Sequence, residues 1–175
     1  MLVEFKKRGL REKVVAANGH CMYSAVADQM RQLGLAVGVG DDEGGGGDGE
    51  EGEDEKEKGK GELRNDDYKI VRMRAATFIS EHPDDFVPFL EEPLDEYVHK
   101  IRDTGEWGGQ LELMALAKTY NLKISVLQGD GRVEEIESGE AEARGEAWLA
   151  YYRHGFGLGE HYNSLRKSES AKDKG

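Results

Sequence analysis

Hydrophobic residues recur along this chain at two different periods, and the change between them divides the sequence. In the first part, apolar residues at spacings of three and four predict amphipathic helices. The expected helices cover residues 2–8, 21–33, 68–80, 94–102 and 110–120, with a short helical or turn segment at 84–90. Later the apolar residues alternate, which is typical of strands. The expected strands cover residues 122–127, 133–136 and 148–152, after a brief extended piece at 13–15. Helices followed by a strand meander predict an α+β domain, with a small β-sheet packed against helices.

Residues 38–62 interrupt this pattern with a run made almost wholly of Gly, Glu, Asp and Lys. Such a segment cannot bury enough apolar surface to offset the cost of ordering its backbone, so we expect a disordered insertion. Within it, residues 41–62 hold eleven acids and three lysines, a net charge of −8 out of −12 for the chain. We interpret the insertion as a solvated spacer; the alternative is an acidic segment that attracts a basic partner. The acidic balance also argues against direct nucleic-acid binding.

The chain length, the single cysteine and the distribution of apolar residues limit the classes of protein to which this chain can belong. A chain of 175 residues suits one domain. A single cysteine excludes an internal disulfide and a cysteine-rich zinc site, and it favours a reducing compartment, which we expect to be the cytoplasm. No apolar run approaches the roughly 20 residues of a membrane span, and from the first residues we expect no signal peptide. We therefore expect a monomer without membrane, metal or cofactor.

The single cysteine, Cys21, lies where a glycine-containing turn meets the helix expected at 21–33. Backbone N–H groups in the first turn of a helix lack intrahelical partners, and the helix dipole is positive there. Both effects stabilise a thiolate and can bring a cysteine pKa from about 8.5 to roughly 3.5–7.5. The sequence therefore predicts a nucleophile whose neighbouring N–H groups could also bind an oxyanion. A buried and chemically inert cysteine is the alternative.

A second candidate group, His161 with Asn163, lies near the end of the chain. A thiol nucleophile needs an imidazole to accept its proton, and the imidazole needs a partner that fixes its tautomer. If His161 lies on a strand, the two-residue period places Asn163 on the same face, where its amide could hold the ring. An ordinary histidine at a strand end is the alternative interpretation.

Three segments, taken together, resemble a known family. They are Asn18-Gly19-His20-Cys21-Met22-Tyr23, Glu106-Trp107-Gly108-Gly109 and His161-Tyr162-Asn163-Ser164. In this order they are similar to the signature of the ovarian tumour (OTU) deubiquitinases, which is Asp-Gly-x-Cys, Trp-Gly-Gly and His-Tyr-Asn/Asp-Ser. The residues around Cys21 most resemble the subgroup linked with the small ribosomal subunit. Asn18 departs from the pattern, because it stands where the family has aspartate.

The resemblance implies a papain-like fold of OTU type, with a catalytic domain at 1–167 and a flexible tail at 168–175. It also implies that Cys21 attacks the carbonyl at the ubiquitin C-terminus and that His161 transfers the proton. Asn163 and Asn18 both remain candidates for the third catalytic member.

Four further residues are implied to line the oxyanion hole or the cleft. The backbone around Gly19 is expected to supply oxyanion donors, and His20 is expected to be structural or to line the cleft. For Trp107 and Gly108, the residues themselves favour core packing at a helix entry, whereas the resemblance implies a place beside the cleft.

The predicted function is therefore a cysteine-type deubiquitinase with a Cys-His-Asn site, and its partner is ubiquitin or a ubiquitin conjugate. Two alternatives remain open. One is a catalytically weak ubiquitin-binding module, which the departure at Asn18 favours. The other is an interaction protein whose acidic insertion and cleft bind a basic ribonucleoprotein surface, such as the small ribosomal subunit.

Overall fold

The computed structural model describes residues 1–38, 67–153 and 159–168. The acidic insertion expected at 38–62 lies outside these ranges except for Gly38. The tail expected at 168–175 lies outside them except for Ser168, whose N–H donates to Gly9 O at 2.8 Å.

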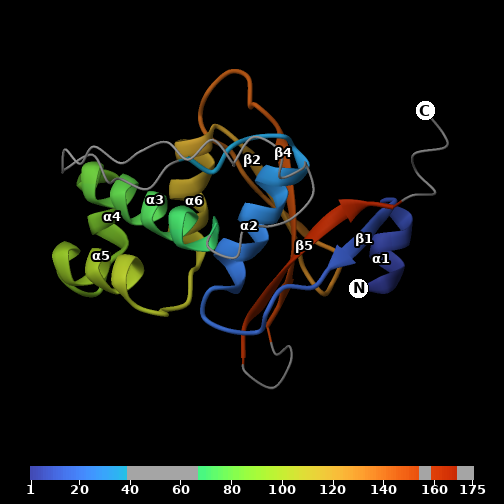
Figure 1. Cartoon of the computed structure of the whole chain (residues 1–175), viewed down its shortest axis with the longest axis horizontal. Helices are drawn as coiled ribbons and strands as arrows, with labels where there is room; N and C mark the ends of the chain where they lie inside the picture. The colour runs from blue at the N-terminus through green and yellow to red at the C-terminus, as the bar shows by residue number, and fades with distance from the viewer. Residues whose placement is uncertain (39–66, 154–158, 169–175) are drawn as a thin grey trace, which may run out of the picture.

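Seven helical segments and five strands make up the described part of the chain (Figure 1). The helical segments are α1 (Leu2–Lys7), α2 (Cys21–Gln32), α3 (Asp67–Glu81), α4 (Pro83–Phe86), the 3₁₀ helix η1 (Val87–Phe89), α5 (Leu94–Asp103) and α6 (Gln110–Tyr120). The strands are β1 (Leu10–Lys13), β2 (Lys123–Leu127), β3 (Val133–Ile136), β4 (Glu146–Tyr152) and β5 (His161–Lys167).

The five strands form one sheet in the order β1-β5-β4-β2-β3. Only β2 and β4 are parallel among these neighbours; the other pairs are antiparallel. The register pairs Lys13 of β1 with Ser164 of β5, so β1 ends before it reaches the first three residues of β5. The chain beyond β1 instead turns towards α2 along this part of β5, and Val15 N–H donates to the Asn163 side chain at 3.0 Å.

Helix α2 lies between the sheet on one side and the helices α3 and α6 on the other (Figure 1). Nine of its twelve residues are buried, and they include the polar Asp28 and Gln29. The spacing of Met22, Val26 and Met30 predicted a helix with one buried face. That part of the prediction is wrong, because α2 is covered from two sides.

The opposite face of the sheet carries a smaller apolar cluster under α1. Phe5 of α1 is buried against Leu127, Ala150 and Leu165, which come from β2, β4 and β5. The sheet is therefore covered on both faces, with the main core on the α2 side.

Gln29 joins α2 to the sheet where β4 and β5 part. The last antiparallel pair between these strands is Leu149 with Ser164. Beyond that pair, the Gln29 side-chain amide makes the hydrogen bonds that a backbone peptide group would make between strands. Trp148 N–H donates to Gln29 Oε1 at 2.8 Å, and Gln29 Nε2 donates to Leu165 O at 2.5 Å. Its Nε2 also donates to Ser164 Oγ at 2.7 Å.

Asp28, next to Gln29, makes the second set of contacts between α2 and β5. Its carboxylate accepts a hydrogen bond from Ser164 Oγ at 2.5 Å and forms an ion pair with Arg166. Because Asp28 is fully buried, these donors are what offset the cost of removing its charge from water.

Most expected elements are confirmed to within two residues at their ends, and the α+β class is confirmed. The extended piece predicted at 13–15 is the exception, because the strand is β1 at Leu10–Lys13. Val14 and Val15 favour a strand by composition, but Val14 is 60 % exposed and lies beyond the pairing with β5. Backbone pairing, rather than side-chain preference, decided this element.

We predict that Gln29→Ala lowers the free energy of unfolding by about 3 kcal/mol. The substitution leaves the Trp148 N–H and the Leu165 carbonyl without their partner, and each unsatisfied buried group costs about 1–3 kcal/mol. Urea denaturation of the purified chain measures this. Gln32→Ala on the same helix is the matched control, because Gln32 is exposed, and equal stabilities of the two variants would contradict the bridging role of Gln29.

Candidate active site

The turn that leads into α2 is held by hydrogen bonds from its own residues. Asn18 Oδ1 accepts from His20 N–H at 2.9 Å, and Asn18 O accepts from Cys21 N–H at 3.1 Å. The sequence interpretation treated the N–H groups at this helix start as unpaired. The structure corrects this for His20 and Cys21, because the Asn18 side chain and backbone already accept their hydrogens. An oxyanion would have to compete with Asn18 for these two donors.

Two glycines allow close approaches near the turn. Gly19 lets the turn approach the 104–109 loop, and Gly108 lets that loop approach α2. A Cβ atom on Gly19 would lie 1.8 Å from Gly105 O, so no other residue fits without moving the backbone. A Cβ atom on Gly108 would lie 2.4 Å from Met22 Cε and 3.0 Å from Tyr23 Cζ. Gly108 is thus buried in packing contact with α2, which matches the packing alternative for this segment.

Arg72 of α3 donates hydrogen bonds to both the turn before α2 and the 104–109 loop. Its guanidinium donates to Gly19 O at 3.0 Å, to Glu106 O at 2.7 Å and to Ile101 O at 2.8 Å. It also lies over the ring of Tyr23, 4.3 Å from the centroid. Arg72 is only 3 % exposed, and burial lowers its pKa while Tyr23 and Glu112 act in the opposite direction.

A buried carboxyl group accompanies this buried guanidinium. Glu112 of α6 is buried, and its Oε1 accepts from Tyr97 Oη at 2.6 Å. Burial raises the pKa of Glu112, while the bond from Tyr97 and the charge of Arg72 lower it. Burial also raises the pKa of Tyr97, so its hydroxyl remains a donor at neutral pH. The interior beneath the turn thus contains polar groups of both signs.

His161 and Asn163 lie on the same face at the start of β5, as the two-residue period predicts. His161 Nε2 is 2.6 Å from Asn163 Oδ1. Because Oδ1 only accepts, Nε2 must carry the proton, and the neutral ring then has its basic lone pair on the buried Nδ1. This is the tautomer in which Nδ1 can take a proton from a thiol.

The Cys21 thiol lies against the backbone of Tyr162, the residue that follows His161. Burial raises the pKa of this thiol, and backbone N–H groups, first that of Tyr162, act to lower it. The prediction of a depressed thiol pKa is therefore wrong for this structure. The favourable helix start is outweighed because Cys21 is only 1 % exposed, and desolvation disfavours the charged form. Cys21 needs a base in order to react.

Two cavities flank the candidate residues. One, of about 330 Å³, is lined by Asn18, His20 and Tyr68 among others. The His20 ring packs on that of Tyr68 with centroids 4.6 Å apart, and burial and the charge of Arg72 lower the pKa of His20. His20 therefore lines a cavity on the α3 side.

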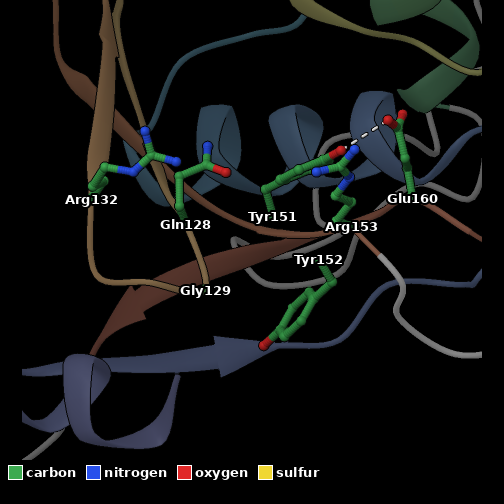
Figure 2. A pocket seen from close by; sticks show the side chains of 7 residues that line it. All are labelled: Gln128, Gly129, Arg132, Tyr151, Tyr152, Arg153 and Glu160. Atoms are coloured by element: carbon green, nitrogen blue, oxygen red, sulfur yellow. Dashed lines mark hydrogen bonds between the residues drawn. The ribbon is translucent and has the colours of Figure 1, made fainter.

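The other cavity, of about 420 Å³, is lined by residues on both sides of His161 in sequence, Glu160 and Tyr162, and by Gly109 and Gln110. It adjoins a second pocket shown in Figure 2, where Tyr151 Oη donates to Glu160 Oε1 at 2.9 Å. Trp107, which was expected beside the cleft, is partly buried against the main core instead.

The structure thus groups the expected residues into three sets. Asn163 contacts His161; Asn18 contacts the backbone of its own turn; and Cys21 lies beside Tyr162. Sequence reasoning missed Arg72, and it also missed Glu12 of β1, which accepts from Asn163 Nδ2 at 2.5 Å. A charged residue inside the apolar stripe of α3 was a signal for Arg72, whereas nothing in the local sequence distinguishes Glu12.

Comparison with known proteins decides the family. The model of the OTU-like cysteine protease family matches residues 50–162, a range that includes Trp107 and His161 and begins after Cys21. The chain belongs to the OTU-like cysteine protease family.

Named relatives of this OTU chain agree with that assignment. It is 33 % identical over 170 residues to a mouse (Mus musculus) protein named deubiquitinase OTUD6B, covering 91 % of this chain and 47 % of the relative. It is 30 % identical over 182 residues to OTU domain-containing protein 2 of Saccharomyces cerevisiae, covering 95 % of this chain and 48 % of the relative. The chain therefore spans about half the length of the curated relatives it matches.

A solved structure described as an ovarian tumour domain in complex with ubiquitin shares the fold. Its TM-score with this OTU chain is 0.58 at 16 % identity, covering 89 % of this chain and 69 % of the other. This confirms the expected OTU-type fold.

No three His, Cys, Asp or Glu side chains in the described ranges are grouped as a metal ion would require. Of the helices formed by those residues, none has the length and apolar character needed to cross a membrane.

We predict that Gly19→Ala is far more disruptive than Gly105→Ala, although the two glycines touch. The added methyl at position 19 meets a backbone oxygen that cannot move alone, whereas at position 105 the nearest atom is 3.8 Å away on His20. Thermal melting should show a loss of several degrees for Gly19→Ala and about none for Gly105→Ala. Equal melting temperatures would contradict the close approach of the two loops.

Proposed function

We propose that this chain is a cysteine-type deubiquitinase that hydrolyses peptide and isopeptide bonds at the C-terminus of ubiquitin. The observation that carries the proposal is the 2.6 Å contact between His161 Nε2 and Asn163 Oδ1, because it leaves Nδ1 as the basic nitrogen. Membership in the OTU-like cysteine protease family and the name of the mouse relative support this reaction. The complex of the structurally similar OTU domain supports ubiquitin as the substrate.

The proposed reaction proceeds through an acyl-enzyme. His161 Nδ1 takes the proton from the Cys21 thiol, and the sulfur bonds to the carbonyl carbon at the ubiquitin C-terminus. The carbon–nitrogen bond then breaks as the imidazolium gives its proton to the leaving amine. Water attacks the resulting thioester as His161 accepts one of its protons. The carbon–sulfur bond then breaks, the imidazolium returns that proton to the sulfur, and the released carboxylic acid ionises to the carboxylate.

The burial of Cys21 gives His161 a specific task in this reaction. Because burial raises the thiol pKa, the resting nucleophile is protonated, and the base must remove the proton as the carbonyl is attacked. Backbone N–H groups that stabilise the thiolate, first that of Tyr162, assist this transfer.

Asn163 is the third member of the proposed site, in preference to Asn18. A Cys–His pair can work with asparagine because the partner has only to orient the imidazole. The contact of Asn163 with the ring supports this assignment, and the bond from His20 N–H to Asn18 Oδ1 supports a turn-forming role for Asn18.

The cavity of about 420 Å³ beside Glu160 and Tyr162 is the proposed path for the ubiquitin tail, because it borders the start of β5. The cytoplasmic compartment, the monomeric state and the small ribosomal subunit as a partner rest on the sequence and its resemblance, and they stay predictions.

We predict that Cys21→Ala abolishes turnover of a fluorogenic ubiquitin substrate and keeps the fold. The substitution removes one sulfur atom at a helix start, whereas no second cysteine can replace the nucleophile. Turnover and melting temperature are measured on the same preparation, together with capture by a thiol-reactive ubiquitin probe. If the wild-type chain binds ubiquitin but neither turns over nor reacts with the probe, the binding-module alternative holds instead.

We predict that Asn163→Ala slows turnover strongly and Asn18→Ala only weakly. The loss for Asn163→Ala should be roughly 100-fold smaller than that for Cys21→Ala, as in subtilisin, where removing the orienting residue costs less than removing the nucleophile. Asn18→Ala loses one turn hydrogen bond while its backbone carbonyl still holds Cys21 N–H. Steady-state kinetics on matched variants decide the order, and an inactive Asn18→Ala beside an unaffected Asn163→Ala would overturn the assignment.

A further inference from the structure

Glu12 is a charged residue in contact with the Asn163 side chain, on the side away from His161. It lies on β1 opposite Leu165 of β5, two residues along the strand from Asn163. A diagonal neighbour of this kind is within reach of a long side chain. Glu12 Oε1 accepts from Asn163 Nδ2 at 2.5 Å.

The same carboxylate oxygen has a second donor, Tyr152 of β4. Tyr152 Oη donates to Glu12 Oε1 at 2.6 Å, and Figure 2 shows the Tyr152 side chain directed towards β1, away from Tyr151 and Glu160. Burial and the bond to Glu12 raise the pKa of Tyr152, so the hydroxyl stays protonated and acts only as a donor to Glu12. Tyr152 also pairs with His161 across the two strands.

The Asn163 amide thus has a different partner at each end. Its Oδ1 accepts from Val15 N–H at 3.0 Å and contacts His161 Nε2. Its Nδ2 faces Glu12. If the amide were turned over, its NH₂ group would meet the Val15 N–H, and its oxygen would meet the carboxylate. Both contacts are repulsive, because an N–H only donates and a carboxylate only accepts.

We infer that Glu12 is a positioning residue that fixes the orientation of the Asn163 amide, and through it the Nε2-protonated tautomer of His161. This inference rests on the proposed function, since it assigns the residue that holds the proposed third catalytic member. The Val15 N–H holds the oxygen end of the amide, and it acts in the same direction as Glu12. Glu12 constrains the other end, and Tyr152 in turn holds Glu12.

The test compares three variants of the full chain. Glu12→Ala removes the acceptor and should lower kcat on a ubiquitin substrate with KM unchanged. The expected loss is on the order of 10- to 100-fold, the range known for outer partners of metal-binding histidines. Glu12→Gln keeps a carbonyl oxygen that can accept from Asn163 Nδ2, so it should retain most of kcat. Arg11→Ala, at an exposed position next to Glu12 on β1, is the matched control, with kcat within a few-fold of wild type.

A second measurement separates positioning from a general effect on folding. Nitrogen-15 NMR of the imidazole should report one tautomer of His161, with the proton on Nε2, in the wild type and in Glu12→Gln. In Glu12→Ala it should report a mixture of tautomers. Melting temperatures of all variants accompany the spectra.

Two results would overturn the inference. One is a Glu12→Ala variant with the kcat and the His161 tautomer of the wild type. The other is a Glu12→Gln variant as impaired as Glu12→Ala, because acceptance of the Nδ2 hydrogen would then not be what matters. Absence of turnover in the wild type would instead contradict the proposed function, and the NMR measurement would still decide the role of Glu12.

Discussion

The Gln29 side chain is the contact on which the arrangement of this domain depends. It replaces a peptide group between β4 and β5 where their pairing ends, and it belongs to a helix buried from both sides. From Cys21 to Gln29 the helix rises about 12 Å, and from Tyr162 to Leu165 the strand rises about 10 Å. Fixing Gln29 against Leu165 therefore brings Cys21 beside Tyr162, next to the proposed base. The stability of the core and the geometry of the site share the same contact.

The buried charge of Arg72, on α3, is the second constraint on the arrangement of the domain. Among the residues that the structure describes, three backbone carbonyls accept hydrogen bonds from Arg72, and no carboxylate pairs with it directly. Two of these carbonyls, from Gly19 and Glu106, belong to the loops that meet above it. A buried charge without partners is costly, so the loops and the guanidinium stabilise one another. The turn before Cys21 is thereby attached to α3 as well as to the sheet.

The same burial that builds the core raises the pKa of Cys21, the proposed nucleophile. A helix start favours a thiolate, but removal of Cys21 from water favours the thiol, and desolvation prevails here. A protonated thiol makes the orientation of His161 more important, because the thiolate does not form without a base. The chain of contacts from Tyr152 through Glu12 and Asn163 to His161 runs across the neighbouring strands β4, β1 and β5.

The sequence by itself determined the local elements, the nucleophile candidate and the pair His161 and Asn163. Helical periodicity, strand alternation and the two-residue spacing of that pair are properties of neighbouring residues, so they could be read without coordinates. Only the tertiary structure decided the direction of the Cys21 pKa shift, the different contacts of Asn18 and Asn163, and the contacts of Arg72 and Glu12. These depend on burial and on partners far away in sequence: Glu12 lies 151 residues from Asn163, and Arg72 lies 53 residues from Gly19. No local pattern carries such information, because the free energy of each group is set by what the fold packs against it.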